Sequence, residues 1–131
     1  KSYNNTIPLF LTEKQLRKAI NKIRTNLLEP GEPKDPDDST VFQVWAAFAD
    51  EAETARMRQA FVEGIAWGEA KKQLFELINA ELAEARDSYN RLLDDPGHIE
   101  SVLQRGAEKA RAHSVPLMQK VREAVGISPM A

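Results

Sequence analysis

Positively charged side chains are the residues of this 131-residue chain whose spacing most clearly suggests chemistry. One set lies near the start of the chain at helical spacing and comprises Lys14, Arg17, Lys18 and Lys22. A second, mostly basic set lies near the end and comprises Arg105, Lys109, His113 and Lys120. A strip of cations on one helix face attracts the phosphates of a nucleic acid. Either strip could instead be structural, as a solvated face in the first case and as side chains paired with acids in the second.

The remaining ionisable residues form no catalytic or metal-binding set. His98 and His113 are the only histidines, and no ligand spacing joins them. The acid pairs Asp37–Asp38 and Asp94–Asp95 both stand at predicted helix starts, where carboxylates accept hydrogen bonds from free backbone amides. The sequence therefore predicts no metal site and no independent active site.

Charge and composition set broad bounds on the protein. The net charge of −2 is distributed unevenly, with +5 on residues 1–24 and −6 on residues 25–64. No apolar run approaches the roughly 20 residues that a membrane-spanning helix needs. The chain has no cysteine, which is typical of a cytosolic protein. We therefore expect a cytoplasmic protein of one domain's size that does not act at a membrane.

Apolar periodicity predicts an all-α fold, a helical bundle of about five helices with a short extended N-terminal segment. The helices are expected near residues 13–24, 40–49, 51–63, 68–94 and 96–125. The fourth helix carries the longest apolar stripe, which includes Leu74, Ile78, Leu82, Tyr89 and Leu92. We expect the flanking segments to pack against this helix, because such a stripe cannot be hidden by one helix alone.

Several residues mark the predicted helix ends. Thr12 and Gln15 form a capping box, and Gly64 suits a C-terminal cap with positive φ. Trp45 falls on an apolar helix face and is expected in the core. Further helix starts are expected at Ser39 or Thr40, at Asp50, and at Asp95 before Pro96.

The first residues, Lys1-Ser2-Tyr3-Asn4-Asn5-Thr6-Ile7, resemble the end of the KMSKS loop of class I aminoacyl-tRNA synthetases and the segment after it. This version is similar to that of the bacterial-type tryptophanyl-tRNA synthetase family in particular. The similarity continues, in family order, through residues 29–40, 64–72, 106–111 and 121–126. The resemblance implies the C-terminal part of such an enzyme, entered inside the KMSKS loop.

The resemblance also implies what the whole enzyme does. Members of the family activate tryptophan with ATP and Mg2+ and transfer it to tRNA(Trp). They act as homodimers and do not bind DNA. Lys1 would be the second lysine of the motif, with a catalytic role at the ATP phosphates, and Ser2 would be its closing serine. A lysine there stabilises charge that develops in the transition state. The rest of the catalytic machinery would precede Lys1, so we expect the isolated chain to be inactive.

Three parts of the chain follow from this interpretation. Residues 1–12 would be the remnant of the KMSKS loop and the segment after it. Residues 13–39 would be a basic helix and an acidic, proline-rich linker, and residues 40–131 a helical, anticodon-side domain that binds tRNA. An alternative is a free-standing helical module that binds protein partners.

Overall fold

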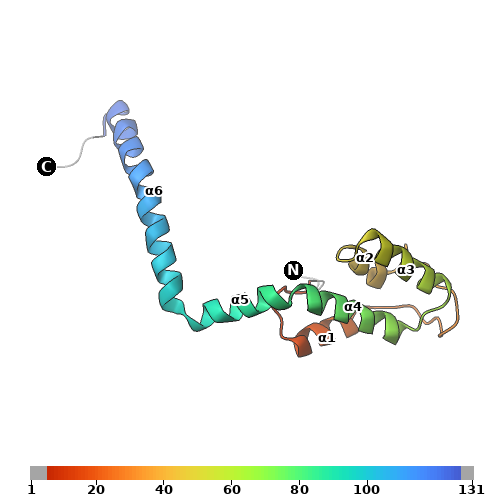
Figure 1. Ribbon diagram of the computed structural model, residues 1–131. Helices are drawn as coiled ribbons and strands as arrows, with labels where there is room; N and C mark the ends of the chain where they lie inside the picture. Colours follow the sequence, from red (N-terminus) through yellow and green to blue (C-terminus); the bar gives the residue numbers. More distant parts are fainter. Residues whose placement is uncertain (1–5, 128–131) are drawn as a thin grey trace. The chain divides into compact units, whose positions relative to one another are not determined.

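The computed structural model describes residues 6–127, which contain six α-helices and no strand (Figure 1). The helices are α1 (Glu13–Asn21), α2 (Thr40–Ala46), α3 (Glu51–Val62), α4 (Trp67–Glu81), α5 (Ala83–Asp94) and α6 (Pro96–Ala124). The all-α class is therefore confirmed, whereas the prediction of about five helices is wrong. None of these helices is both long and apolar enough to cross a membrane.

The additional helix arises because the predicted helix over residues 68–94 is divided at Leu82. This residue has φ −93° and ψ 0°, and it separates α4 from α5. Leu82 packs against the core, whereas Tyr89 and Leu92 further along the same stripe are exposed. The sequence does not mark this position with glycine or proline.

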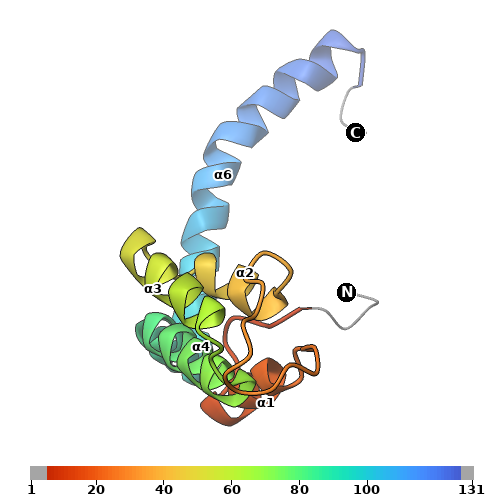
Figure 2. The same ribbon diagram turned by 90° about the vertical axis from the view of Figure 1, so that its right-hand side faces the viewer.

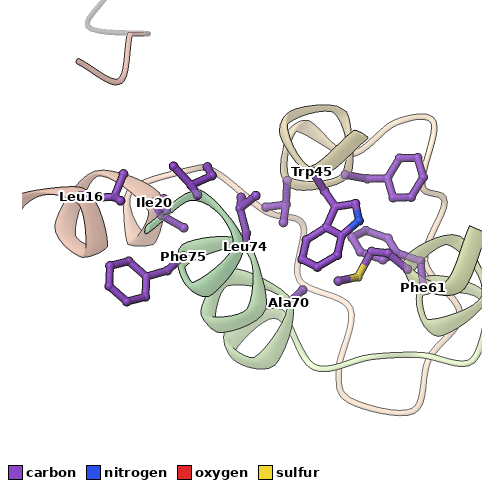
Figure 3. Close-up of a cluster of buried hydrophobic side chains, with 11 residues drawn as sticks. Leu16, Ile20, Trp45, Phe61, Ala70, Leu74 and Phe75 are labelled. Atoms are coloured by element: carbon purple, nitrogen blue, oxygen red, sulfur yellow. The ribbon is translucent and has the colours of Figure 1, made fainter. Parts of the chain in front are cut away.

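The hydrophobic core lies within the first of two compact units, Lys1–Ser88, and is built by α1 to α4. The first helix lies alongside α4 (Figures 1 and 2). Figure 3 shows Leu74 of α4 between Ile20 of α1 on one side and Trp45 of α2 on the other. Trp45 is 3% exposed, so the prediction that it is a core residue is confirmed. The fourth helix therefore packs against both α1 and α2.

The predicted helix caps are largely present. Thr12 and Gln15 form the complete capping box of α1, and Ser39 rather than Thr40 caps α2. Asp50 accepts a hydrogen bond from the backbone of Glu53 at the start of α3. The caps expected at Asp95 for α6 and at Gly64, with φ +88°, are also present. These short-range signals could be read correctly because each depends on neighbouring residues alone.

Asp37 has a different role from the one its position predicts. Instead of satisfying amides at a helix start, its carboxylate accepts hydrogen bonds at 2.8 and 3.1 Å from the guanidinium of Arg58 on α3. This partner is 21 residues away in the sequence. The hydrogen bonds from Arg58 hold the pKa of Asp37 below its ordinary value of 3.8.

The acidic, proline-rich segment between α1 and α2 is docked on the end of α3. The Gly31 amide donates to the Gly64 carbonyl at 2.8 Å, and the Lys34 amide donates to the Phe61 carbonyl at 2.9 Å. Lys34 is only 2% exposed, and its ammonium donates to the carbonyls of Glu29 and Glu32 at 2.8 and 2.9 Å. The segment thus folds around a lysine whose charge is met by backbone oxygens.

The second unit, Tyr89–Ala131, contains the end of α5 and all of α6. The sixth helix continues through Pro116, and none of its residues is buried. Val102, Leu103, Val115 and Leu117 are among the exposed apolar side chains of this helix. The helix therefore presents most of its side chains, both apolar and charged, on its surface.

Candidate nucleic-acid interface

The two residues expected at the ATP phosphates, Lys1 and Ser2, lie outside the described residues. The candidate positions on α1 and α6 are all described. In the described part of the chain, no group of three or more histidine, aspartate or glutamate residues is arranged to hold a metal ion. The candidate nucleic-acid interface therefore consists of the basic side chains of α1 and α6.

The cations of the N-terminal set do not share one environment. The guanidinium carbon of Arg17 lies 4.0 Å from the centroid of the Phe75 ring on α4. Phe75 is a core residue at 5% exposure, so Arg17 covers the edge of the core. A guanidinium stacked in this way both attracts the ring and shields it from water. Arg17 thus has a structural contact that its position in the sequence did not reveal.

Lys18 and Lys22 instead line a pocket of about 590 Å³ on the other side of α1. The pocket lies between α1, the non-helical segment before it and the start of α2. Arg24 lines the same pocket and was not among the predicted site residues. Lys14 is exposed and does not line it. The structure therefore brings together two of the four predicted cations and adds a third.

A lysine of α4 fixes the segment that carries Arg24. The ammonium of Lys71 donates hydrogen bonds to the carbonyls of Asn21 and Ile23, at 3.1 and 2.7 Å. Burial lowers the pKa of Lys71 below its ordinary value of 10.5. Because α1 ends at Asn21, these carbonyls have no helical partner of their own, and Lys71 satisfies them. The chain just after α1 is therefore held against α4.

The C-terminal set lies along α6. Arg105, Lys109, His113 and Lys120 are all exposed. Among the residues that the structure describes, none of these four forms an ion pair. Within the described part of the second unit, this set is therefore exposed and forms no ion pair.

Sequence reasoning missed Arg24 and Arg86 for different reasons. Arg24 was placed inside a helix that was expected to reach residue 24, whereas α1 ends three residues earlier. Arg86 is only 8% exposed, and its Nη1 donates to the Asn79 side chain at 2.9 Å. Position 86 continues the four-residue steps of Ile78 and Leu82, which could have indicated that it faces inward.

Comparisons with known proteins identify the family. No family model matches the sequence. The chain is 54% identical over 130 residues to the tryptophan–tRNA ligase of Neisseria meningitidis serogroup A, covering 99% of this chain and 39% of that protein. It is 50% identical over 127 residues to the tryptophan–tRNA ligase of Pseudomonas aeruginosa, covering 97% of this chain and 28% of that protein.

A solved structure agrees with these relatives. The tryptophanyl-tRNA synthetase of Campylobacter jejuni, in complex with ADP and tryptophan, matches with a TM-score of 0.92 and 38% identity. The match covers 96% of this chain and 40% of that one. All of these relatives are aminoacyl-tRNA synthetases, and the chain belongs to this class of proteins. Within it, the chain belongs to the tryptophan–tRNA ligase family and spans less than half the length of these relatives.

Proposed function

We propose that this chain is the C-terminal, tRNA-facing portion of a tryptophan–tRNA ligase. The whole enzyme would be a cytoplasmic homodimer of class I that activates tryptophan with ATP and transfers it to tRNA(Trp). The observation that carries the proposal is the similarity along nearly the whole chain, at 54% identity, to one part of a ligase more than twice as long. The KMSKS remnant would comprise residues 1–12. The basic helix with its linker would comprise residues 13–39, and the tRNA-binding domain residues 40–131.

The chemistry that this portion would supply is electrostatic. Lys1 would contact the phosphates of ATP, which enters as its Mg2+ complex, and Ser2 would stand beside it. An ammonium at this place contributes most where negative charge increases on the way to the transition state. The exposed cations of α1 and α6 would contact tRNA phosphates, which position the nucleic acid without reading its bases.

A chimeric enzyme tests the proposal. The residues of the Neisseria meningitidis ligase that align with this chain are replaced by it, and tryptophan-dependent ATP–pyrophosphate exchange and tRNA charging are measured. We expect both activities in the chimera and neither in the 131-residue chain alone. A chimera that folds but is inactive would contradict the proposal.

A variant of the same chimera tests the role of Lys1. We expect Lys1→Ala to raise the activation free energy of adenylate formation by about 2–4 kcal/mol, the scale for removing one preorganised charge. Tryptophan affinity should change little. If the substitution weakens ATP binding and turnover equally, Lys1 only holds ATP in the ground state.

A further inference from the structure

Within residues 6–127, the ionised side chains that line the pocket beside α1 are all positive. Lys18, Lys22 and Arg24 contribute three cations, and no aspartate or glutamate of the described residues lines the pocket. Another hollow of the same unit, beside α3 and α4, is lined by one arginine and three glutamates. This contrast matters because acids predominate over bases in the chain as a whole. The pocket beside α1 therefore favours an anion, whereas the other hollow does not.

The spacing and anchoring of the three cations suit a phosphate group. Lys18 and Lys22 are one helical turn apart and so project from the same side of α1. The segment just before Arg24 is fixed by the hydrogen bonds of Lys71 to the Asn21 and Ile23 carbonyls. The position from which the arginine extends is thus set by the fold. Three cations from two directions can surround one oxyanion.

The rest of the lining indicates what accompanies the phosphate. The volume of about 590 Å³ far exceeds that of a bare phosphate and lies in the range of small-molecule sites. Thr6, Gln15 and Thr40 provide polar groups, while Ile7, Leu11 and Val44 provide aliphatic surface. Among residues 6–127, no aromatic side chain lines the pocket, so this part of the chain offers no ring on which a base could stack. These features favour a ribose and its phosphate over a base.

We propose that this pocket binds one sugar–phosphate unit of the tRNA backbone, with the phosphate held by Lys18, Lys22 and Arg24. The inference rests on the proposed function and narrows it, because it separates these three residues from Arg17 and Lys14. The pocket then positions tRNA without recognising its sequence, since backbone contacts carry no base information. Another elongator tRNA should bind there as well as tRNA(Trp) does.

The test measures binding of a tRNA(Trp) transcript to the 131-residue chain over a range of salt concentrations. Lys18→Gln, Lys22→Gln and Arg24→Gln are compared with Lys14→Gln, which removes the same charge from the same helix outside the pocket. Each pocket variant should weaken binding roughly threefold to tenfold. It should lower the salt slope by at most about 0.7–0.9, because the three cations hold one phosphate between them. Lys14→Gln should change both much less, and circular dichroism should show an intact fold in all four.

Three outcomes would overturn the inference, and they differ in what they say about the proposed function. Equal losses in all four variants would mean a diffuse positive field instead of a pocket. Unchanged binding in all four variants would place the tRNA contact outside this helix and leave the proposed function standing. If free ATP binds to the chain, if the pocket substitutions abolish that binding, and if tRNA does not displace the ATP, the pocket binds a mononucleotide instead. The activity of the chimera tests the proposed function independently of all three.

Discussion

The guanidinium of Arg17 lies over the ring of Phe75, with 4.0 Å between its central carbon and the ring centroid. Four neighbouring cations that look equivalent in the sequence thereby differ in the structure. Lys18 and Lys22 line the pocket beside α1, whereas Lys14 lies outside it. Arg17 covers the core residue Phe75. Substitutions on this one short helix should therefore separate stability from binding.

Arg17→Ala should lower the free energy of unfolding by about 1 kcal/mol, since it removes a cation–π contact and the aliphatic cover of Phe75. Urea unfolding followed by circular dichroism measures the change. Lys14→Ala is the matched control and should alter stability by less than about 0.5 kcal/mol, as expected for an exposed surface position. An equal effect of the two substitutions would mean that the Arg17–Phe75 contact contributes nothing.

On α6, Arg105→Ala and Lys109→Ala should each weaken tRNA binding and reduce its salt dependence, by about 0.7–0.9 in slope for each phosphate that is no longer neutralised. The melting temperature should remain nearly constant because both side chains are exposed and in no ion pair among the described residues. Fluorescence anisotropy with labelled tRNA and thermal melts provide the two readouts. A lower melting temperature with an unchanged salt slope would show that these residues serve the fold.

Gly64→Ala should destabilise the protein by at least about 2 kcal/mol, the combined scale of left-handed backbone strain and a steric clash. The residue has φ +88°, and an added Cβ would lie 2.4 Å from the carbonyl carbon of Gly31. A side chain there would therefore have to displace a backbone neighbour. Gly68→Ala is the control, because it lies inside α4 with nothing within 4 Å and should stabilise by about 0.5–1 kcal/mol. Chemical unfolding of both variants measures the two changes in the free energy of unfolding.

The Asp37–Arg58 pair should make stability depend on pH at the acid end. Because the pKa of Asp37 is lower in the folded protein than its ordinary 3.8, ionisation favours the folded state. This contribution is complete above pH 3.8 and disappears as the pH falls through the lowered pKa. The melting temperatures of the unmodified chain and Asp37→Asn should therefore differ at about pH 7 and converge under strongly acidic conditions.

The same pair is exposed, so dissolved salt provides a control. The difference in melting temperature near neutral pH should shrink in about 1 M NaCl, where charges on the surface are screened. Asp38→Asn removes an identical charge from the neighbouring residue and should not reproduce the pH dependence. A difference that persists unchanged in acid would have to come from a contact other than the ion pair.

Local signals in this sequence predicted local structure well. The capping box at Thr12, the cap at Asp50 and the positive φ at Gly64 were all confirmed. Each depends on hydrogen bonds within a few residues, so the sequence contains the whole interaction. The burial of Trp45 on the apolar face of α2 was also confirmed.

What the sequence did not reveal depends on distant partners. Periodicity shows that a segment has an apolar helical face but not where its backbone departs from helical geometry, so the break at Leu82 was missed. Spacing likewise could not separate Arg17 from Lys18, since Phe75, which distinguishes them, is on another helix. Arg24 was missed because it reaches the pocket from a segment that was expected to be helical.

The buried ammonium of Lys34 has a consequence for digestion by proteases. Exposed loops are the preferred sites of proteolytic cleavage, and trypsin cuts after lysine. Here the lysine that trypsin would need is 2% exposed, and two backbone carbonyls hold its side chain inside the loop. The Lys34–Asp35 bond should consequently survive a brief digestion that cuts after exposed lysines such as Lys14. The segment that looks most like a hinge in the sequence would then remain uncut in the folded chain.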